Sequence, residues 1–248
     1  MTVVVTGAAS GIGQATCVQL SQLYASTGSK GGACVVHAID MKDGMDETAS
    51  LCEKGDGFQL VAHPGVDVSI DPLPEIAGVT ILVNNAGIQE GDDRQVLTNN
   101  VMSVMRCTER YALRNPSVRS VVNLASTSAH TGAEFGAYTA SKGAVLSYTK
   151  WAAKQLAPHA TCNSISFGGV RTPLNERVYE GAKWAKIMDV TPMKKWLSTR
   201  EAADWILFVA LRNESMTAQD IVIDNGEMYS RWSSQAIPRP DGIQTDLR

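Results

Sequence analysis

Tyr138 and Lys142 are the residues of this chain whose types and spacing point most directly to catalysis. They stand four positions apart in a segment that we predict to be helical, so both side chains project from one face of the helix. A tyrosine hydroxyl has a pKa of about 10 and is a weak proton acceptor at neutral pH. A neighbouring ammonium group favours the phenolate, so the two residues together can act as a general acid and base.

The spacing alone is not decisive, because Tyr179 and Lys183 repeat it. Tyr138 differs in its context, since it follows an apolar run, residues 121–125, that ends in Ser126. We predict this run to be a buried strand, and ligands of open parallel sheets bind at the carboxyl ends of the strands. Ser126 can therefore hydrogen-bond the same substrate oxygen that Tyr138 protonates or deprotonates. The second pair is interpreted as a surface or lid feature.

A glycine-rich segment directly follows the first apolar run of the chain. It is Thr6-Gly7-Ala8-Ala9-Ser10-Gly11-Ile12-Gly13, with the spacing G-x-x-x-G-x-G. Glycine permits a tight turn from strand to helix and a close approach of the backbone to a pyrophosphate, whose charge is bound by N–H groups at the start of the helix. We predict a dinucleotide site here, with contacts from Gly7, Ser10, Gly11, Ile12 and Gly13.

Asp40 ends the second apolar run, residues 35–40. An acid at this place can accept hydrogen bonds from the ribose hydroxyls of adenosine, and it repels a 2′-phosphate. Ser10 and Met41 provide no cation for such a phosphate, and Lys42 alone is a poor substitute. The alternative is a solvated carboxylate without a ligand. The sequence therefore favours NAD over NADP as the cofactor.

Apolar β-branched runs alternate along the chain with longer amphipathic stretches. This alternation is typical of βαβ units and predicts a parallel sheet that is covered by helices on both faces. The predicted strands are 3–5, 33–39, 58–62, 79–83, 120–124, 161–165 and 221–223, and the predicted helices are 11–25, 93–114, 137–156 and 200–211. No repeat or linker divides the chain, so we expect one domain over residues 1–248.

Two further motifs lie between the glycine loop and Ser126. Asn84-Asn85-Ala86-Gly87 follows the fourth strand, and Asn100 lies in the next helix. Together with Tyr138-Thr139-Ala140-Ser141-Lys142, these motifs stand in the order typical of the short-chain dehydrogenase/reductase family, classical type. The chain resembles that family from Val3 to about Gly226. The resemblance implies a Rossmann-type, doubly wound parallel sheet of about seven strands.

The resemblance also implies roles for individual residues. Tyr138 would be the acid/base, and Ser126 would orient the carbonyl or alcohol. Lys142 would bind the nicotinamide ribose and lower the tyrosine pKa, while Asn100 would hold a water that relays protons from Lys142. The other matching cofactor positions are Asp67 and Val68 for the adenine, Asn84, Ala86 and Gly87 for the adenosine side, and Val170 and Thr172 for the nicotinamide carboxamide.

Four departures from the family pattern are visible. Phe167-Gly168 replaces Pro-Gly, and Asp224-Asn225-Gly226 replaces Asp-Gly-Gly. The connection 69–78 leaves little room for the usual helix, and the stretch from Gly87 to Asn100 is short, which suggests an open substrate mouth. This trimming resembles that of bacterial 3α-hydroxysteroid dehydrogenase/carbonyl reductases.

The region 168–199 fits the alternation of strands and helices least well. It carries Tyr179, Trp184, Met188, Met193 and Trp196, and it could form an apolar lid over a pocket or an ordinary surface excursion. The tail, residues 227–248, is expected to be extended and to dock on a neighbouring subunit. By resemblance we expect a homo-oligomer, a tetramer or dimer, assembled through the helices 93–114 and 137–156.

Composition excludes several classes of function. The chain has 22 basic and 25 acidic residues and a formal net charge of −3, which argues against a nucleic-acid or membrane-surface partner. It contains no apolar run long enough to span a membrane and no secretory signal. The five scattered cysteines and four histidines lack metal-ligand spacing and predict free thiols in the cytoplasm, with no metal site.

The preferred hypothesis is an NAD-dependent alcohol dehydrogenase or carbonyl reductase that acts on a small-molecule alcohol or carbonyl substrate. A dinucleotide-binding sensor without catalysis is the alternative, although a pure binder needs no acid/base. The chain is too short for the substrate domain of an extended-type epimerase, and it lacks the ligands of a metal-dependent dehydrogenase.

Overall fold

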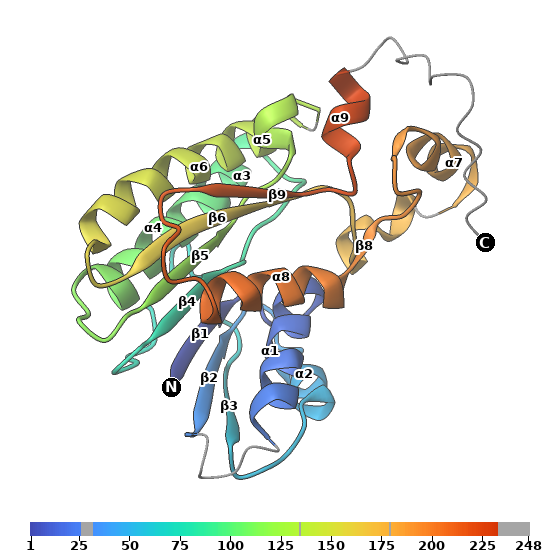
Figure 1. Cartoon of the computed structure of the whole chain (residues 1–248). Coiled ribbons are helices and arrows are strands. Elements are labelled where there is room, and N and C mark those ends of the chain that lie inside the picture. The colour runs from blue at the N-terminus through green and yellow to red at the C-terminus, as the bar shows by residue number, and fades with distance from the viewer. Residues whose placement is uncertain (26–31, 134, 179, 233–248) are drawn as a thin grey trace.

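The computed structural model describes residues 1–25, 32–133, 135–178 and 180–232 (Figure 1). The predicted strands and helices are present, with ends that differ by a few residues. In chain order the elements are β1 (Thr2–Thr6), α1 (Gly11–Tyr24), β2 (Cys34–Ile39), α2 (Met45–Leu51), β3 (Phe58–His63), β4 (Ile81–Asn84), α3 (Asp93–Leu97), η2 (Thr98–Met102), α4 (Ser103–Thr108), η3 (Glu109–Leu113), β5 (Ser120–Leu124), α5 (Ser128–Thr131), α6 (Gly136–Leu156), β6 (Thr161–Phe167), β7 (Val170–Arg171), η4 (Pro173–Val178), α7 (Gly181–Val190), β8 (Leu197–Ser198), α8 (Thr199–Leu211), β9 (Asp220–Ile223) and α9 (Glu227–Trp232).

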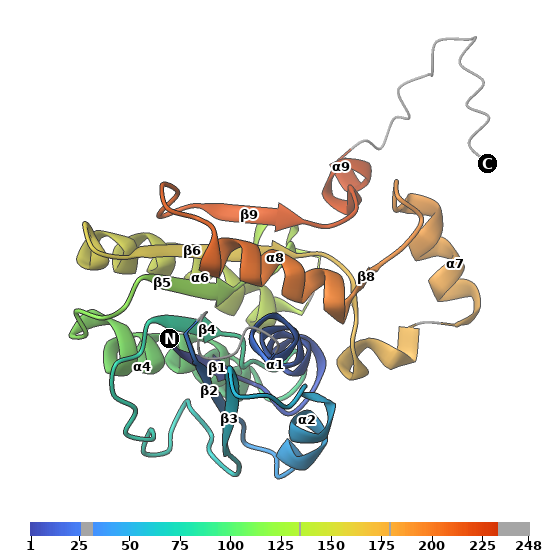
Figure 2. The same cartoon turned by 60° about the horizontal axis from the view of Figure 1, so that its bottom comes forward.

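Seven parallel strands form the main sheet, in the order β3-β2-β1-β4-β5-β6-β9. The order reverses between β1 and β4, which is the doubly wound arrangement expected from the sequence. Helices α1 and α8 cover one face, and α4 and α6 cover the other (Figures 1 and 2). The predicted single-domain, Rossmann-type fold is therefore confirmed.

The alternation of side chains along β1 explains its uninterrupted apolar sequence. Val3 and Val5 pack in the cluster that contains residues of α1 and α8, whereas Val4 packs in the cluster that contains residues of α4 and α6. A strand buried on both faces needs apolar residues at every position. The uninterrupted apolar sequence of β1 therefore indicates that helices cover both faces of the sheet, in addition to indicating a strand.

Several shorter elements were not expected. Helices α2, α5, α7 and α9 and the two-stranded sheet of β7 and β8 are additional, and the predicted helix 93–114 contains two π-helical segments, η2 and η3. Short elements carry too few residues for periodicity to identify them. The expected tail contributes α9, and its remainder lies outside the described residues.

The sheet brings the predicted motifs to one edge. The glycine loop follows β1, Asn84-Asn85-Ala86-Gly87 begins at the last residue of β4, Ser126 follows β5, and the segment from Val170 follows β6. Parallel strands end at the same edge, so these loops are neighbours in space.

Among the described helices, none has the length and apolar character needed to cross a bilayer. The five cysteines are free and buried.

Candidate active site

The glycine loop is held tightly against the end of β4. Gly7 has a φ of +67°, and a Cβ on Gly13 would lie 2.1 Å from the Gly7 carbonyl oxygen, so both positions require glycine. The amide of Asn85 donates to the carbonyl oxygens of Thr6 (2.9 Å) and Gly7 (3.0 Å). The Thr6 hydroxyl in turn accepts the backbone N–H groups of Asn85 and Ala86. The loop geometry is thus built by residues 80 positions apart in sequence.

The start of α1 presents its N–H groups without a side-chain cap. Ser10 is the N-cap residue in an extended conformation, and its hydroxyl makes no capping hydrogen bond. The N-terminus of a helix left open in this way is suited to bind a phosphate. A Cβ on Gly11 would lie 3.5 Å from Cγ2 of Thr172, which places the segment after β6 beside the glycine loop. Gly11 and Thr172, predicted to contact opposite ends of the dinucleotide, therefore border one site.

Asp40 lies beside the glycine loop with its carboxylate fixed. Its Oδ2 accepts the N–H of Ala9 at 2.9 Å, its Oδ1 accepts the N–H of Lys42 at 2.9 Å, and the residue is only 8% exposed. Each carboxylate oxygen can accept a further hydrogen bond. A negative charge is therefore held at the position where the ribose hydroxyls of a dinucleotide would bind.

Asp67 and Val68 lie in a turn after β3. Oδ1 of Asp67 accepts both the N–H and the hydroxyl of Ser69, at 2.9 and 2.6 Å. Oδ2 of Asp67 and the N–H of Val68 take part in none of the hydrogen bonds among the described residues. An acceptor and a donor thus lie on adjacent residues. Adenine carries the complementary pair, a 6-amino donor beside the ring acceptor N1.

Asn84 departs from the expected role. Its side chain is 3% exposed and donates to Asn123 Oδ1 (2.8 Å) and Thr108 Oγ1 (3.1 Å), so it lies inside the protein between β4 and β5. Only its backbone can face a cofactor. Asn85, which was not among the predicted contacts, instead anchors the glycine loop. The alternation of side chains along β4 is the signal that could have separated the two asparagines.

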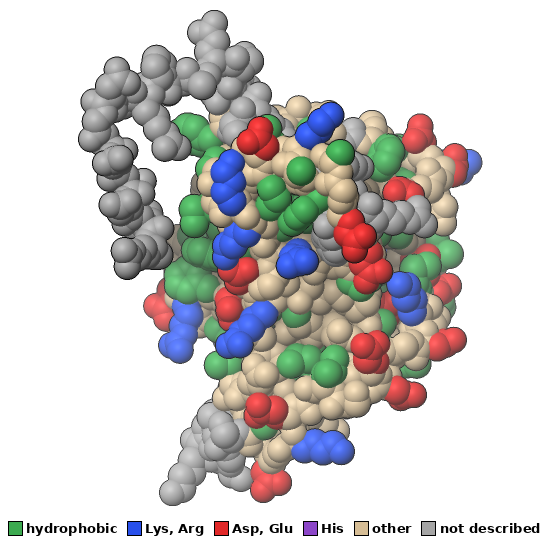
Figure 3. Space-filling model, turned by 90° about the vertical axis from the view of Figure 1, so that its right-hand side faces the viewer, with side chains coloured by type: hydrophobic (Ala, Val, Ile, Leu, Met, Phe, Trp, Pro, Cys, Tyr) green, Lys and Arg blue, Asp and Glu red, His purple; other side chains and the backbone are tan. Residues whose placement is uncertain are grey.

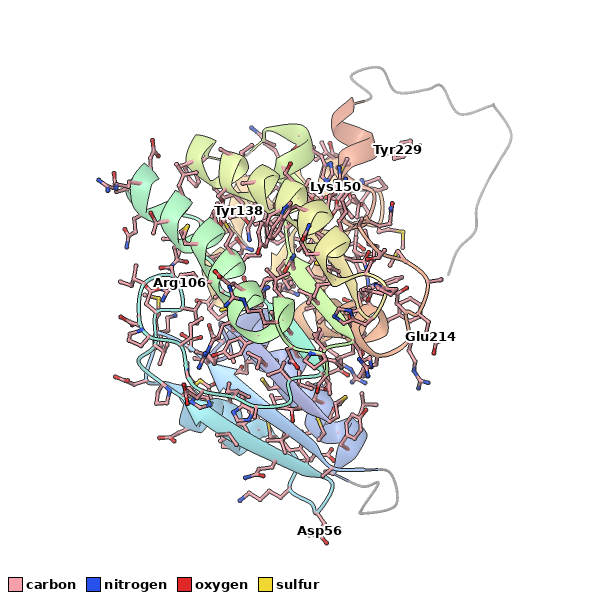
Figure 4. The ribbon with its side chains drawn as sticks, turned by 90° about the vertical axis from the view of Figure 1, so that its left-hand side faces the viewer. Asp56, Arg106, Tyr138, Lys150, Glu214 and Tyr229 are labelled. Carbon is pink, nitrogen blue, oxygen red and sulfur yellow. The ribbon has the colours of Figure 1, made fainter. Side chains whose placement is uncertain are left out.

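Tyr138 and Lys142 lie in the first two turns of α6, as predicted, and Figure 4 labels Tyr138 on this helix. The Lys142 Nζ lies 5.7 Å from the centre of the Tyr138 ring and donates to the carbonyl oxygen of Leu124 at 2.9 Å. Lys142 is 6% exposed, and burial lowers the pKa of its ammonium to about 8. At neutral pH the amine is therefore still cationic, next to the phenol and poorly screened by water.

Gly87 links the end of β4 to this cationic centre. A Cβ on Gly87 would lie 3.0 Å from Asn100 Oδ1 and 3.5 Å from Lys142 Nζ. Gly87, Asn100 and Lys142 therefore lie close together, as the sequence analysis predicts. Gly87 also leaves the approach to the ammonium open, because a side chain there would contact both groups.

Asn100 is buried in the π-helical turn η2, with 1% of its surface exposed. Its Oδ1 accepts the N–H of Ile88 (2.7 Å), and its Nδ2 donates to the Ile88 carbonyl (2.8 Å) and to Ser141 Oγ (2.9 Å). The amide is therefore occupied by protein groups and holds the start of the loop after Gly87. The main-chain carbonyl of Asn100 accepts the Ser103 hydroxyl at 3.5 Å, and the water relay at this residue stays a prediction.

Ser126 follows β5 and is 9% exposed. Its Oγ accepts the N–H of Ser128 at 3.1 Å, which leaves the hydroxyl hydrogen to be donated to a ligand. Lys142 binds the carbonyl of Leu124, two residues earlier, so the serine and the lysine belong to one strand end. The structure thus brings the four predicted catalytic residues to the carboxyl edge of β4 and β5.

The segment after β6 differs from the expectation in one respect. Val170 is 3% exposed and pairs with Leu197 of β8, so its side chain belongs to the core and only its backbone can meet a cofactor. The ring of Trp196 packs on Gly169, where a Cβ would lie 2.0 Å from it. The Gly169 N–H donates to the buried Glu227 at 3.1 Å, a residue that the sequence did not single out.

The region 168–199 forms a folded unit beside the site. Trp184 of α7 and Trp196 contact each other edge to face, with ring centres 5.3 Å apart. Figure 3 shows the face of the molecule that carries this region, where Lys and Arg side chains are numerous. Within the region 168–199, Arg171, Lys186 and Lys194 are exposed. Tyr179 and the side chain of Lys183, the second pair with the Tyr–Lys spacing, lie outside the described residues.

A doubly wound sheet with a glycine loop after β1 and a Tyr–Lys pair after β5 defines a class of Rossmann-fold oxidoreductases. Residues 7–227 match the sequence model of a family described as enoyl-(acyl carrier protein) reductase. The chain therefore belongs to the short-chain dehydrogenase/reductase family.

The curated proteins that resemble this chain carry different functional names. The chain is 29% identical to the "uncharacterized oxidoreductase YxbG" of Bacillus subtilis over 272 residues, covering 95% of this chain and 94% of the relative. It is also 29% identical to the 3-oxoacyl-[acyl-carrier-protein] reductase FabG of Thermotoga maritima over 248 residues, covering 90% and 95% of the two chains.

Solved structures show the same fold. A structure from Agrobacterium tumefaciens with bound NADP, provisionally named a 2-deoxy-D-gluconate 3-dehydrogenase, matches with a TM-score of 0.79 and 25% identity, over 92% of this chain and 96% of the other. A 3-oxoacyl-[acyl-carrier protein] reductase of Brucella melitensis with bound NAD matches with a TM-score of 0.70 and 21% identity, over 91% and 90%.

Proposed function

We propose that this protein is an NAD-dependent oxidoreductase that transfers a hydride between a secondary alcohol or ketone and the nicotinamide. The observation that carries the proposal is the buried Lys142 ammonium, placed 5.7 Å from the Tyr138 ring and hydrogen-bonded to Leu124, the last residue of β5, two positions before Ser126. Burial of a cation without a charged partner destabilises the folded state, so a function for the cation is expected. Activation of a phenol as a proton donor and acceptor is such a function.

The residues present suit a dinucleotide along its whole length. The uncapped start of α1 would hold the pyrophosphate, and Asp40 would accept the ribose hydroxyls of the adenosine. The acceptor and donor of Asp67 and Val68 match the edge of adenine. Thr172, with the backbone of Val170, would hold the nicotinamide end. The bound nicotinamide supplies or accepts the hydride.

The protein residues control the proton. Tyr138 donates its hydroxyl proton to the carbonyl oxygen during reduction and takes it back during oxidation. Ser126 donates a hydrogen bond to the same oxygen and so aligns the carbonyl carbon. Lys142 stabilises the phenolate that remains, because its charge acts at short range in a site where water is scarce.

NAD is preferred over NADP in this proposal because of Asp40. The carboxylate is fixed by two backbone N–H groups, at 2.9 Å each, and cannot turn away from an added 2′-phosphate without losing them. Family membership alone does not decide the choice, since related structures hold NADP or NAD.

The alternative, a sensor that binds the dinucleotide without chemistry, would require the glycine loop and Asp40 but not a buried lysine beside a tyrosine. Such a lysine lowers stability at neutral pH, because burial disfavours its charged form. A pure binder could use Lys142 for the nicotinamide ribose, but it needs no tyrosine hydroxyl beside the ammonium. The pairing of Lys142 with Tyr138 therefore favours the enzyme.

The substitution Tyr138→Phe tests the catalytic assignment. Removing the hydroxyl should lower kcat by about 10³-fold or more, since general acid–base catalysis contributes roughly 10²–10⁴-fold. NADH binding should stay within about twofold, because the ring and Lys142 remain. Turnover would be followed by NADH formation with sterols, cyclic alcohols, polyols and hydroxy acids, with NADP in parallel, and NADH binding by fluorescence titration.

Tyr148→Phe is the matched control, because Tyr148 lies on the same helix and its hydroxyl interacts with the Met105 carbonyl, at 3.5 Å, and with Thr108, neither of which belongs to the predicted site. The control should keep full activity. Wild-type rates in Tyr138→Phe would show that Tyr138 is not the acid/base.

We also propose that the protein is a homo-oligomer. Met102, Met105 and Trp151 are large apolar side chains on η2, α4 and α6 that are 38%, 37% and 48% exposed. A second copy would remove this apolar surface from water. Sedimentation equilibrium measures the state directly.

A further inference from the structure

The segment between β3 and β4 contains no helix after its first turn, as the short connection 69–78 predicts. Instead, side chains from α4, η3 and the following turn donate hydrogen bonds to its backbone. Arg106 donates to the carbonyls of Val68 (3.3 Å) and Asp71 (2.6 Å), Tyr111 to Pro74 (2.9 Å) and Asn115 to Val79 (2.7 Å). We call Arg106, Tyr111 and Asn115 the donor row.

The donor row supplies hydrogen bonds to backbone carbonyls of this segment, which a helix would otherwise satisfy within its own backbone. Backbone carbonyls that are not paired within a helix or sheet need other donors when they are removed from water. Arg106 lies in α4, Tyr111 in η3 and Asn115 just beyond the end of η3, and the three side chains contact the segment in sequence order. The row therefore fixes the path of the segment across the sheet.

Arg106, which Figure 4 labels, is the member of the donor row that binds the turn after β3, through the carbonyl of Val68. The turn from Asp67 to Asp71 is closed from within by the Asp67 N–H, which donates to Asp71 Oδ2 (2.8 Å), and by the Asp71 N–H, which donates to the Asp67 carbonyl (2.8 Å). Arg106 closes the same turn from outside, since it binds the carbonyls of both Val68 and Asp71. The acceptor and donor that suit adenine are thus carried by a turn that Arg106 holds.

We propose that Arg106 is a positioning residue for adenine, which sets the preference of the site for this base through the turn of Asp67 and Val68. The inference rests on the proposed function, because it assumes a bound dinucleotide. In this proposal Arg106 acts through the turn, whose carbonyls it binds, and not through a contact of its own with the cofactor. Its planar guanidinium holds two carbonyls at once, which the single ammonium of a lysine does less well.

The neighbouring arginine provides a contrast. Arg110 lies one helical turn further and pairs with Glu75 at 3.1 Å, but the two side chains are 43% and 93% exposed. A surface pair of this kind contributes little. Tyr111 holds the segment at Pro74, well beyond the turn of Asp67. Substitutions of Arg110 and Tyr111 are therefore matched controls for Arg106.

The test compares two dinucleotides, NADH and reduced nicotinamide hypoxanthine dinucleotide, in which an oxygen replaces the 6-amino group of adenine. The wild-type protein should bind NADH about tenfold more tightly, the equivalent of one hydrogen bond to a charged acceptor. Arg106→Met should raise the Kd of NADH by about tenfold and leave the Kd of the hypoxanthine analogue nearly unchanged, so that the preference disappears. In turnover assays the loss should fall on KM for NAD rather than on kcat.

The controls separate positioning from general stability. Tyr111→Phe should lower Tm yet keep the adenine preference, and Arg110→Met should change neither. Arg106→Lys, which is more conservative, should keep part of the preference and serves as the readout if Arg106→Met does not fold.

Three results would count against the inference in different ways. Retention of the preference in both Arg106 variants would overturn it, and so would an equal loss of preference in Tyr111→Phe. If the wild-type protein bound neither dinucleotide, the proposed function would fall together with the inference.

Discussion

Replacing Lys142 by methionine should make the protein more stable at neutral pH while abolishing its activity. Burial lowers the pKa of the Lys142 ammonium from 10.5 to about 8. Since each pKa unit is equivalent to about 1.4 kcal/mol, the charged amine destabilises the folded state by about 3 kcal/mol at neutral pH. A methionine of similar length carries no charge and removes this term.

The gain is smaller than the full term because Lys142 donates a hydrogen bond to the Leu124 carbonyl. Losing that bond costs about 1 kcal/mol, so a net gain of about 2 kcal/mol is expected. Activity should fall to background, because the phenolate of Tyr138 loses the cation that stabilises it.

The stability difference should depend on pH with a defined sign. The pKa of Lys142 is lower in the folded than in the unfolded state, so the unfolded chain binds more protons between pH 8 and 10.5. The free energy of unfolding of the wild-type protein, as far as it depends on Lys142, therefore rises as the pH increases through that window. The advantage of Lys142→Met should be complete below pH 8. Towards pH 10.5 the desolvation term disappears, and the lost hydrogen bond to Leu124 should leave the variant about 1 kcal/mol less stable than the wild type.

Urea unfolding of both proteins, measured on either side of pH 8, checks this expectation. Lys150→Met is the control, since Lys150 lies on the same helix with its side chain exposed (Figure 4). It should change stability by less than about 0.5 kcal/mol at either pH. A pH-independent difference, or a Lys142→Met protein that is less stable than the wild type at neutral pH, would refute the reasoning from desolvation.

Two further substitutions test the cofactor site. Asp40→Ser should lower the ratio of kcat/KM for NAD to that for NADP by about two orders of magnitude, because a like charge near a phosphate costs several kcal/mol; an unchanged ratio would show that Asp40 does not select the cofactor. Gly13→Ala should reduce stability by about 2 kcal/mol and weaken dinucleotide binding, because its Cβ would lie 2.1 Å from the Gly7 carbonyl oxygen. Gly143→Ala, where a Cβ meets nothing within 4 Å in the middle of α6, should instead add about 1 kcal/mol, and urea unfolding would compare the two.

The sheet and its helices could be predicted because their signals are local. Uninterrupted apolar runs mark strands that are buried on both faces, and Val3–Val5 of β1 is an example. The glycine loop and the Tyr138–Lys142 pair were also visible, since each depends on a few residues that are close in sequence. Their order along the chain was sufficient to indicate the family.

The direction in which individual side chains point was harder to predict from the sequence. Asn84 and Asn85 are adjacent and chemically identical, yet one lies between strands and the other holds the glycine loop. Val170 is buried and pairs with β8, a strand too short to be recognised, so only its backbone can meet a cofactor. Glu227 binds Gly169, 58 positions away, and nothing near either residue indicates the contact.

The sequence by itself determined the order of strands and helices, the glycines that the first loop requires, and the spacing that puts a phenol and an amine on one helical face. These properties depend on the backbone and on neighbours within a few residues. Only the tertiary structure decided that Lys142 is buried, that Asn85 holds the glycine loop, and that Arg106 holds the turn of Asp67. Burial and hydrogen bonding across 35 positions or more arise when distant segments pack together, and a local pattern carries no record of them.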